Sequence, residues 1–305
     1  MNVRTARVRR QVDGVLLLDK PTGLSSNACL GVVKRLFSAA KAGHTGTLDP
    51  FATGLLPVAL GEATKFSQGL LEADKTYRAV MRLGVRTTTG DIEGEVLEAR
   101  PPGADDAAVR AAMARFTGAI DQVPPMHSAL KRDGRPLYEY ARAGVTLERA
   151  SRRVVIHALE FLGRNGDDVA FRVRCSKGTY VRTLAEDIGA RLGCGAHLRE
   201  LRREAVGDLT LDRAFTPQAL EALDVTRRDA CLAPVDALVA VLPRLEIDAA
   251  RAERLRLGQR VPLEGATGDI EECRAYEAGG AFLGLVRVAA GVAHPVRLVQ
   301  VRCGT

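Results

Sequence analysis

GHTGTLDPFATG, residues 43–54, places a single acidic side chain, Asp49, between glycines and directly before a proline. Pro50 restrains the backbone of Asp49 to extended conformations, and the glycines allow a ligand or another backbone segment to approach closely. Together with Lys41 and Ala42, the stretch predicts an ordered loop over residues 41–54, neither helix nor strand, that holds Asp49 in one place. Taken alone it leaves two interpretations open: a carboxylate that caps its own turn, as aspartates commonly do, or one presented for chemistry.

Regular elements flank this loop on both sides. GVLLLDK (14–20) is a short apolar run that ends in Pro-Thr-Gly and predicts a buried strand. Residues 25–37 predict a helix that begins at a Ser-Ser-Asn cap. Residues 76–85 alternate in part and predict a strand, and residues 105–116 predict an amphipathic helix with acidic residues at its start.

The middle of the chain changes character. Residues 120–150 are irregular and basic, and they predict a long loop with one short helix. Beyond them, the apolar runs 152–163 and 169–176 flank Asn165-Gly166, which is a hairpin signal. The two runs are therefore expected to pair as antiparallel strands.

A helix and a further strand complete this part of the chain. Residues 179–193 predict a helix with Thr179 as a cap and Gly193 as its stop, and residues 197–211 lead into a strand. The order of strands and helices is not a regular βαβ alternation, so we expect an α+β fold rather than a doubly wound one.

Length and pattern divide the 305 residues into about two domains. A composition shift lies near 245, after which a short helix at 248–257 and short apolar segments between glycine-rich turns predict a small all-β module. The expected division is a basic tail (1–12), a body (13–244) that contains an insertion (124–150), and a C-terminal module (245–305).

Composition is that of an ordinary soluble protein, with 46% hydrophobic and 27% charged residues. There is no apolar run of membrane-spanning length and no signal-peptide pattern, so we expect a cytoplasmic protein. The net charge of +7 is concentrated in residues 1–12 and 125–213, which favours a polyanionic partner such as nucleic acid. The alternative is plain solubility in an arginine-rich proteome, because 37 of the 44 basic residues are Arg.

Several common chemistries find no support in the sequence. The six cysteines are widely spaced and contain no CxxC pair, so neither a zinc site nor a disulfide framework is indicated. The sequence also lacks GxxxxGK[ST], GxGxxG, GxSxG and HExxH. This argues against the usual NTPase, dehydrogenase, esterase and zinc-protease interpretations.

Five spaced motifs together resemble the TruB family of tRNA pseudouridine synthases, almost from end to end. They are LLLDKPTGLSSN (16–27), GHTGTLDPFATGLLPVALGEATK (43–65), DKTYRAVMRLGVRTTTGD (74–91), PPMHSALK (124–131), and CSKGTYVRTLAEDIG with GAHLRELRR (175–203). One departure is Phe51, where Leu is commoner, and it should affect packing rather than chemistry. The resemblance implies a mixed, mainly antiparallel sheet of pseudouridine synthase type with segregated helices, an inserted RNA-clamping loop and a PUA-like RNA-binding C-terminal module.

The resemblance also implies a reaction. It is the isomerisation of uridine 55 in the T arm of tRNA to pseudouridine, on a flipped-out nucleotide. Because the product is an isomer, neither cofactor nor metal is expected. The carboxylate could attack covalently or remove the C2′ proton to give a glycal, and the sequence does not choose between these routes.

By the same resemblance, Asp49, Tyr77 and Arg182 are the catalytic residues. Tyr180 and Leu201 would line the uracil pocket. Without the motifs, three of these residues would be given structural roles. Arg182 would form a salt bridge in solvent, Tyr77 would lie at the rim of the core, and Leu201 would lie inside the core.

Further contacts with RNA are implied at lower specificity. His44 would fill the space that the flipped base leaves, Lys20 would support the floor of the site, and Asp91 would form a hydrogen bond in the same cleft. The clamp (124–150) would contact phosphates through four basic residues, which are Lys131, Arg132, Arg135 and Arg142. Taken alone, this segment would be interpreted as a solvated loop.

Two other functions are alternatives to a stand-alone pseudouridine synthase. A non-catalytic RNA-binding or RNA-folding protein would need the clamp but not Asp49, although a role in tRNA folding could also accompany catalysis. A relative that works with a guide RNA, as dyskerin does, would carry long charged tails that this sequence lacks. We expect a stand-alone, monomeric enzyme with tRNA as its partner and no obligatory protein partner.

Overall fold

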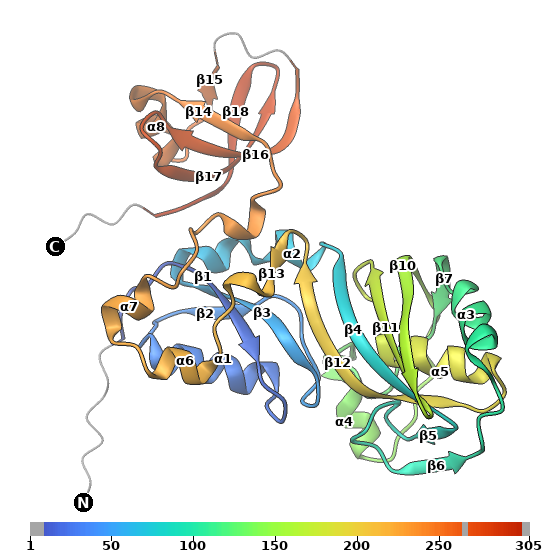
Figure 1. Ribbon diagram of the computed structural model, residues 1–305. Helices are drawn as coiled ribbons and strands as arrows, with labels where there is room; N and C mark the ends of the chain where they lie inside the picture. The colour runs from blue at the N-terminus through green and yellow to red at the C-terminus, as the bar shows by residue number, and fades with distance from the viewer. Residues whose placement is uncertain (1–8, 264–267, 301–305) are drawn as a thin grey trace, which may run out of the picture.

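A nine-stranded mixed sheet forms the body of the molecule (Figure 1) in the computed structural model, which describes residues 9–263 and 268–300. All neighbouring strands pair antiparallel except β3 and β12, which are parallel. The expected α+β class with a mainly antiparallel sheet is confirmed. The strand order is β1 (Gly14–Lys20), β3 (Thr53–Leu60), β12 (Ala196–Val206), β4 (Lys75–Leu83), β11 (Asp168–Cys175), β10 (Arg152–Asn165) and β7 (Gly118–Gln122), with β2 (Ala42–His44) on β3 and β13 (Leu209–Thr210) on β12.

Alternation along the central strands decides which face the helices cover. On β4, Ala79 and Met81 are buried whereas Arg78 is exposed, as the period of two in a strand requires. The buried face packs against α3 (Asp106–Ala114) and α5 (Val181–Arg191) in one core. Tyr77 packs against the same core, so the face that carries the helices also carries the side chains of the site.

The other half of the sheet is covered by different helices. Ser25 caps α1 (Ser26–Leu36) by accepting a hydrogen bond from the Ala28 amide at 3.1 Å. Val33 and Phe37 lie fully buried against Leu16 and Val58. The remaining short helices of the body are η1 (Gly61–Phe66), α2 (Ser67–Leu71), η2 (Leu211–Arg213), α6 (Pro217–Glu221), α7 (Val225–Asp229) and η3 (Ala237–Val239).

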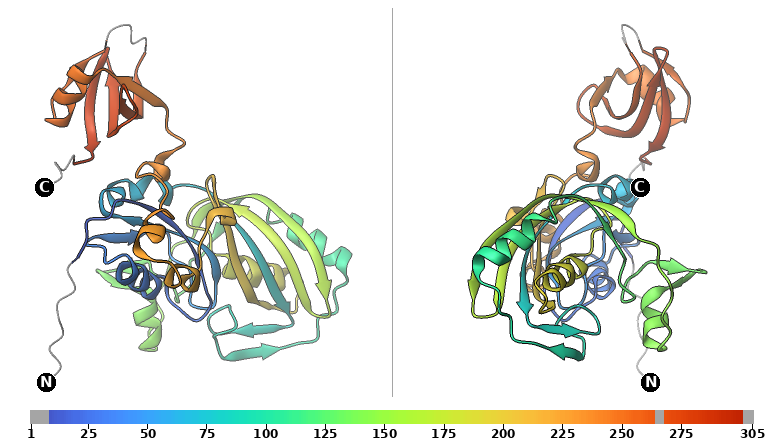
Figure 2. Two further views of the ribbon diagram at one scale, coloured as in Figure 1. Left: turned by 60° about the vertical axis from the view of Figure 1, so that its left-hand side comes forward. Right: turned by 90° about the vertical axis from the view of Figure 1, so that its right-hand side faces the viewer.

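Two excursions leave the body near the middle of the chain. One is the hairpin of β5 (Val85–Thr87) and β6 (Val96–Ala99). The other contains the strand pair β8 (Lys131–Arg132) and β9 (Arg135–Pro136) and the helix α4 (Leu137–Arg142). Figure 2 shows this second excursion projecting away from the sheet. The sequence predicts residues 120–150 to be a long loop with a short helix. The short helix is present as α4, but residues 120–122 belong to β7, and residues 131–132 pair with 135–136 as strands.

A five-stranded sheet with one helix forms a separate body at the C-terminal end (Figure 1). It has its own core, in which Ile247, Leu255 and Val286 are buried. The expected β-rich C-terminal part is therefore present. Its strand order is β14 (Arg244–Ile247), β16 (Ile270–Glu277), β17 (Phe282–Ala289), β18 (Val292–Leu298) and β15 (Val261–Pro262), and its helix is α8 (Ala249–Arg256).

Three local predictions were wrong. Residues 42–44 form the strand β2 because they pair with β3, a contact between segments that no local pattern shows. Thr179 does not cap α5: its hydroxyl donates to the Ser176 carbonyl at 3.0 Å, and the N-cap residue is Tyr180. Asn165 pairs with Asp168, so the hairpin turn is Gly166-Asp167 rather than Asn165-Gly166.

Other expectations concern the whole chain. Most of the basic tail, residues 1–8, lies outside the described residues, as does Cys303. The other five cysteines are free thiols. Within 9–263 and 268–300, no helix is both long and apolar enough to cross a membrane.

Asp187 on α5 generates a prediction about stability. Burial raises the pKa of this carboxyl to about 6, so the folded protein binds its proton more tightly than the unfolded chain does. The cost of ionising Asp187 is absent below about pH 4 and grows as the pH rises to about 6. Asp187→Asn should therefore stabilise the protein at pH 7.5 by about 1–3 kcal/mol, and the gain should vanish near pH 4. Urea denaturation at both pH values measures it.

The exposed Asp208 provides the matched control. Asp208→Asn should change the free energy of unfolding by less than about 0.5 kcal/mol at either pH. A gain from Asp187→Asn that is equal at both pH values would show that burial of the charge is not its cause.

Candidate active site

Two of the five sequence motifs contact each other at the loop that carries Asp49. The Ser26 hydroxyl accepts a hydrogen bond from the Leu48 amide at 2.8 Å and donates to the Leu48 carbonyl at 3.0 Å. The Pro50 carbonyl accepts from the Gly23 amide at 2.8 Å and from Lys20 Nζ at 3.2 Å. The loop is therefore fixed on both sides of Asp49. Lys20 is fully buried beneath this loop, and its role in the site remains a prediction.

The loop's last glycine is required by a close approach of backbones. Gly54 has φ +101°, and a Cβ atom there would lie 2.3 Å from the Arg203 carbonyl oxygen, so no larger residue fits. The Arg203 side chain is also buried, and its Nε donates to the Leu55 carbonyl at 2.7 Å while a terminal nitrogen donates to the Gly46 carbonyl at 3.2 Å. Arg203 thus braces the loop from the side of the sheet.

Arg182 is the partner of the Asp49 carboxylate. Its Nε lies 3.0 Å from Asp49 Oδ2, and another of its nitrogens lies 3.4 Å from Asp91 Oδ2. The same guanidinium donates to the carbonyls of Thr89, at 2.8 Å, and His127, at 2.6 Å. With 3% of its surface exposed, Arg182 is not in the solvent salt bridge that a lone arginine would suggest. It joins three segments at one point.

The turn interpretation of Asp49 finds little support in this geometry. The Ala52 amide donates to the main-chain carbonyl of Asp49 at 3.1 Å, so the turn is closed by backbone. Within the described part of the chain, the contacts of the carboxylate are those with Arg182. The side chain keeps 34% of its surface exposed, and that surface lines the pocket.

Burial and charge act against each other on this carboxylate. Burial raises the pKa of Asp49, Arg182 lowers it, and the neighbouring Asp91 raises it again. A buried carboxyl without a cation would favour its protonated form. Arg182 therefore limits the rise in pKa that burial causes, and Asp91 weakens that effect by sharing the same guanidinium.

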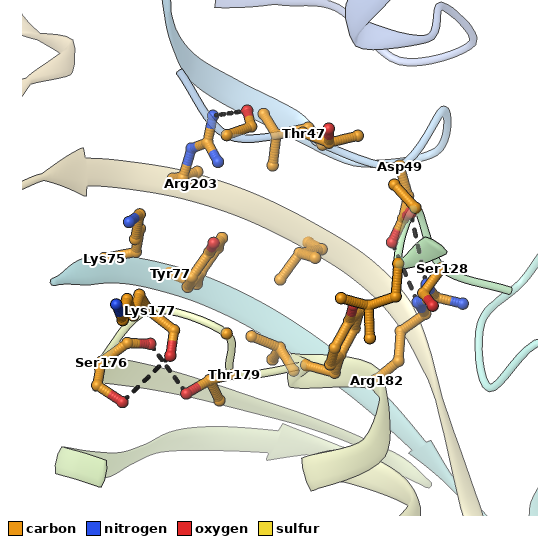
Figure 3. A pocket seen from close by; sticks show the side chains of 18 of the residues that line it. Thr47, Asp49, Lys75, Tyr77, Ser128, Ser176, Lys177, Thr179, Arg182 and Arg203 are labelled. Atoms are coloured by element: carbon orange, nitrogen blue, oxygen red, sulfur yellow. Dashed lines mark hydrogen bonds and ion pairs between the residues drawn. The ribbon is translucent and has the colours of Figure 1, made fainter. Parts of the chain in front are cut away.

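A pocket of about 350 Å³ opens beside Asp49 and brings the predicted uracil-site residues together. Tyr77 comes from β4, Leu201 from β12, and Tyr180 from the start of α5. Figure 3 shows Asp49, Ser128 and Arg182 at one end and Lys75 and Arg203 toward the other. The walls are largely apolar between these charged ends.

Tyr77 is a neutral phenol in this environment. Burial raises its pKa, and the nearby Arg203 lowers it only in part. A phenol with a raised pKa is a poor base at neutral pH. The ring therefore offers a flat wall and a hydroxyl, and any proton that it accepts would need the help of Arg203.

A second, wider cleft of about 640 Å³ meets the first at Asp49 and Arg182. It is lined by His44 and Asp91 and, from the excursion with α4, by Tyr138 and Arg142. The four predicted clamp residues therefore lie in two different places. Arg142 lines this cleft, whereas Lys131, Arg132 and Arg135 lie exposed on β8 and β9, outside both cavities.

His44 stands at the rim of the wider cleft. Its Nε2 lies 3.2 Å from Asn27 Oδ1, and its buried Nδ1 has no hydrogen-bond partner among the residues that the structure describes. Burial lowers the pKa of the ring, and Arg203 lowers it further. The imidazole is neutral at physiological pH, which suits stacking rather than ion pairing.

The pocket residues for which the sequence predicted no role include Lys75, Ser128 and Arg203. Arg203 could have been found, because it lies two residues after Leu201 on a strand and so shares its face. Ser128 lies in the motif PPMHSALK (124–131), and its buried hydroxyl interacts with Tyr180 between the two cavities. Its position depends on the path of the excursion.

Comparison with known proteins matches three family models to the chain. The TruB family pseudouridylate synthase N-terminal domain covers residues 34–181, and the tRNA pseudouridylate synthase B C-terminal domain covers 182–240. The model of the pseudouridine synthase II TruB C-terminal region covers 243–299. The second and third models divide the chain close to the start of the five-stranded sheet.

Curated relatives are similar over nearly their whole length. The chain is 62% identical over 301 residues to a tRNA pseudouridine synthase B of Burkholderia mallei, covering 97% of both chains. It is 60% identical over 300 residues to a protein of the same name from Ralstonia nicotianae, covering 96% of both chains.

Solved structures share the fold. A Cbf5–Nop10–Gar1 complex contains a chain with a TM-score of 0.68 and 30% identity, which covers 90% of this chain and 78% of that one. A structure of an H/ACA RNP bound to a substrate RNA containing 2′-deoxyuridine gives a TM-score of 0.70 at 26% identity, covering 94% and 84%. The similarity extends through both sheets.

The shared guanidinium generates a prediction about protonation. Arg182→Met removes the cation that lowers the pKa of Asp49, so that pKa should rise further. Asp91→Asn removes an anion that raises it, so the pKa should fall. Titration of the Asp49 side-chain carbon by NMR measures both. Shifts in the same direction in the two variants would contradict the arrangement.

Proposed function

Because the chain belongs to the TruB family of pseudouridylate synthases, we propose that it converts uridine 55, in the T arm of tRNA, to pseudouridine. The observation that carries the proposal is the Asp49 carboxylate, held by the buried Arg182 at the mouth of a pocket with Tyr77 and Leu201 in its walls. This arrangement offers one anion, one flat ring and an enclosed space. The reaction needs these three things.

The reaction rearranges bonds without net addition or loss. The N1–C1′ glycosidic bond breaks, the uracil turns within the pocket, a C5–C1′ bond forms, and the hydrogen on C5 is exchanged for one on N1. No electrons leave the nucleoside, so the chain's own side chains suffice. Asp49 acts as the nucleophile or as the base that takes the C2′ proton.

Arg182 makes the carboxylate available for either role. Burial raises the pKa of Asp49, which increases its basicity, and Arg182 opposes that rise and so favours the anion. The contacts of Arg182 with the carbonyls of Thr89 and His127 fix its direction. Asp49 therefore needs little reorientation when a nucleotide arrives.

Tyr77 and Leu201 hold the uracil while it turns. The phenol is neutral, and its ring presents a stacking surface. Tyr180 closes the pocket from the start of α5. Removal of the C5 proton falls to Tyr77 only when Arg203, which sits beside it, stabilises the phenolate.

The wider cleft suits the RNA that surrounds the flipped uridine. Extruding a base costs a few kcal/mol, and the neutral imidazole of His44 can occupy the vacated stack without a proton. Arg142 lies where the clamp meets the cleft, and Lys131, Arg132 and Arg135 add exposed positive charge on β8 and β9. Phosphates supply much of the affinity in such complexes.

The proposal extends to the location, oligomeric state and partners of the enzyme. It acts in the cytoplasm as a monomer on tRNA, without a cofactor and without an obligatory protein partner. The C-terminal sheet is an additional RNA-binding part of PUA-like type. Lys20 and Asp91 act through the loop and through Arg182, as their hydrogen bonds and ion pair indicate.

Position mapping tests the proposed substrate. An unmodified tRNA transcript is incubated with the enzyme, treated with a carbodiimide that marks pseudouridine, and read by primer extension. A single new stop at position 55 is expected, because one flipped nucleotide fits one pocket. A transcript with cytidine at that position should show no stop. Stops at other uridines, or none in the unmodified transcript, would contradict the proposal.

A further inference from the structure

The start of α5 carries two residues of the site, yet its own sequence does not fix its direction. Tyr180 occupies the N-cap position with φ −101° and ψ 108°, and its side chain does not cap the helix. The preceding Thr179 hydroxyl bonds backward to Ser176. Helices commonly begin at a short polar side chain that satisfies their free amides. The contact that holds this end of α5 therefore comes from another segment.

A buried carboxamide on β7 makes this contact. Gln122, the last residue of that strand, is 2% exposed. Its Oε1 accepts from the Tyr180 amide at 2.7 Å, and its Nε2 donates to the Tyr180 carbonyl at 3.1 Å. A main-chain amide only donates and a carbonyl only accepts, so the two bonds together determine which way the carboxamide faces. One side chain thus engages both main-chain polar groups of Tyr180 across 58 residues of sequence.

The course of β7 explains why Gln122 reaches α5. Ile120 and Gln122 lie on one face of the strand, and Ile120 packs against the core that contains α5. Pro124 and Pro125 follow closely and cannot donate to a strand ladder. A buried carboxamide is costly unless it is hydrogen-bonded. Gln122 lines neither cavity of the site, so it acts on the reaction only through the residue that it holds.

The far end of the Tyr180 side chain is held from the same segment of the chain. The Tyr180 hydroxyl interacts with the buried hydroxyl of Ser128, and the ring lines the pocket. Residues 122–128 therefore contact Tyr180 at its main chain and at its hydroxyl. The direction of the ring between these two points depends on both contacts.

Arg182 does not depend on Gln122 in the same way. Its guanidinium has its own contacts with the carboxylates of Asp49 and Asp91 and with two main-chain carbonyls. Loss of the carboxamide would release the main chain of Tyr180 and leave the pair of Arg182 and Asp49 in place. The two functions of the first turn of α5 can therefore be separated by experiment.

We propose that Gln122 is a positioning residue that directs the Tyr180 ring into the pocket, and that conversion of the nucleotide, rather than tRNA binding, depends on its two hydrogen bonds. The inference rests on the proposed function, in which this pocket holds the uracil while it turns. A displaced wall would let the base adopt unproductive orientations, and small displacements of this kind lower rates strongly. Affinity for tRNA should persist, because phosphates supply much of it.

Two variants of Gln122 test the proposal. Gln122→Met keeps the length of the side chain and removes both hydrogen bonds, and Gln122→Asn keeps the carboxamide but is one methylene too short to make both. Gln218→Met on α6 is the matched control, because Gln218 is exposed. We expect kcat for whole tRNA to fall about tenfold to a hundredfold in both Gln122 variants, with KM within about threefold. Gln218→Met should match wild type in both constants.

Fluorine NMR reports the ring without RNA. Protein made with 3-fluorotyrosine contains five labelled rings, and the resonance that is missing in Tyr180→Phe identifies Tyr180. This resonance should move or broaden in Gln122→Met and Gln122→Asn and stay unchanged in Gln218→Met. Urea denaturation of each variant gives the fraction of folded protein under the assay conditions, so that a loss of activity through unfolding is recognised.

The outcomes separate this inference from the proposed function. An unchanged Tyr180 resonance, a loss of kcat no larger than the loss of folded protein, or a rise in KM with kcat unchanged would overturn the role of Gln122 and leave the proposed function intact. A wild-type enzyme that forms no pseudouridine at position 55 would overturn the proposed function and the catalytic consequence with it. The fluorine spectra would still show whether Gln122 orients Tyr180.

Discussion

One buried guanidinium, that of Arg182, connects the parts of the molecule on which the site depends. It contacts the carboxylates of Asp49 and Asp91 and the carbonyls of Thr89 and His127. A buried cation is costly unless its donors are satisfied, and here they are. The helix α5, the loop of Asp49, the turn at Thr89 and the start of the α4 excursion must therefore meet correctly for the site to exist.

The sheet explains why these segments meet. β4 and β12 pair along most of their length and present Tyr77, Leu201 and Arg203 on one face. Arg203 donates hydrogen bonds to the carbonyls of Gly46 and Leu55. On the other side of the loop, Lys20 and Ser26 donate hydrogen bonds to its carbonyls. The main chain on both sides of Asp49 is thus fixed, which lowers the reorganisation required in the proposed reaction.

Local patterns were enough for part of the regular structure. β1, α1, α3 and the β10–β11 hairpin follow from apolar periodicity, caps and turns, which act over a few residues. β2 did not, because its pairing with β3 is tertiary, and the cap of α5 did not, because the Thr179 hydroxyl bonds backward to Ser176. The site divides in the same way. The motifs marked Asp49 and Arg182, but their 3.0 Å contact spans 133 residues. Ser128 lies in the motif PPMHSALK (124–131), yet nothing local places it beside the pocket.

Tritium release from a tRNA transcript labelled at uridine C5 tests the proposed role of Asp49 most directly. It is measured for wild type and Asp49→Asn in parallel. Pseudouridine formation expels that hydrogen, so release reports the reaction itself. We expect wild type to release about one tritium per tRNA and Asp49→Asn to release none. The tRNA affinity of Asp49→Asn should stay within a few-fold of the wild-type affinity, because phosphates supply most of the binding. Release by Asp49→Asn at the wild-type rate, or loss of binding together with activity, would contradict the proposed role of Asp49.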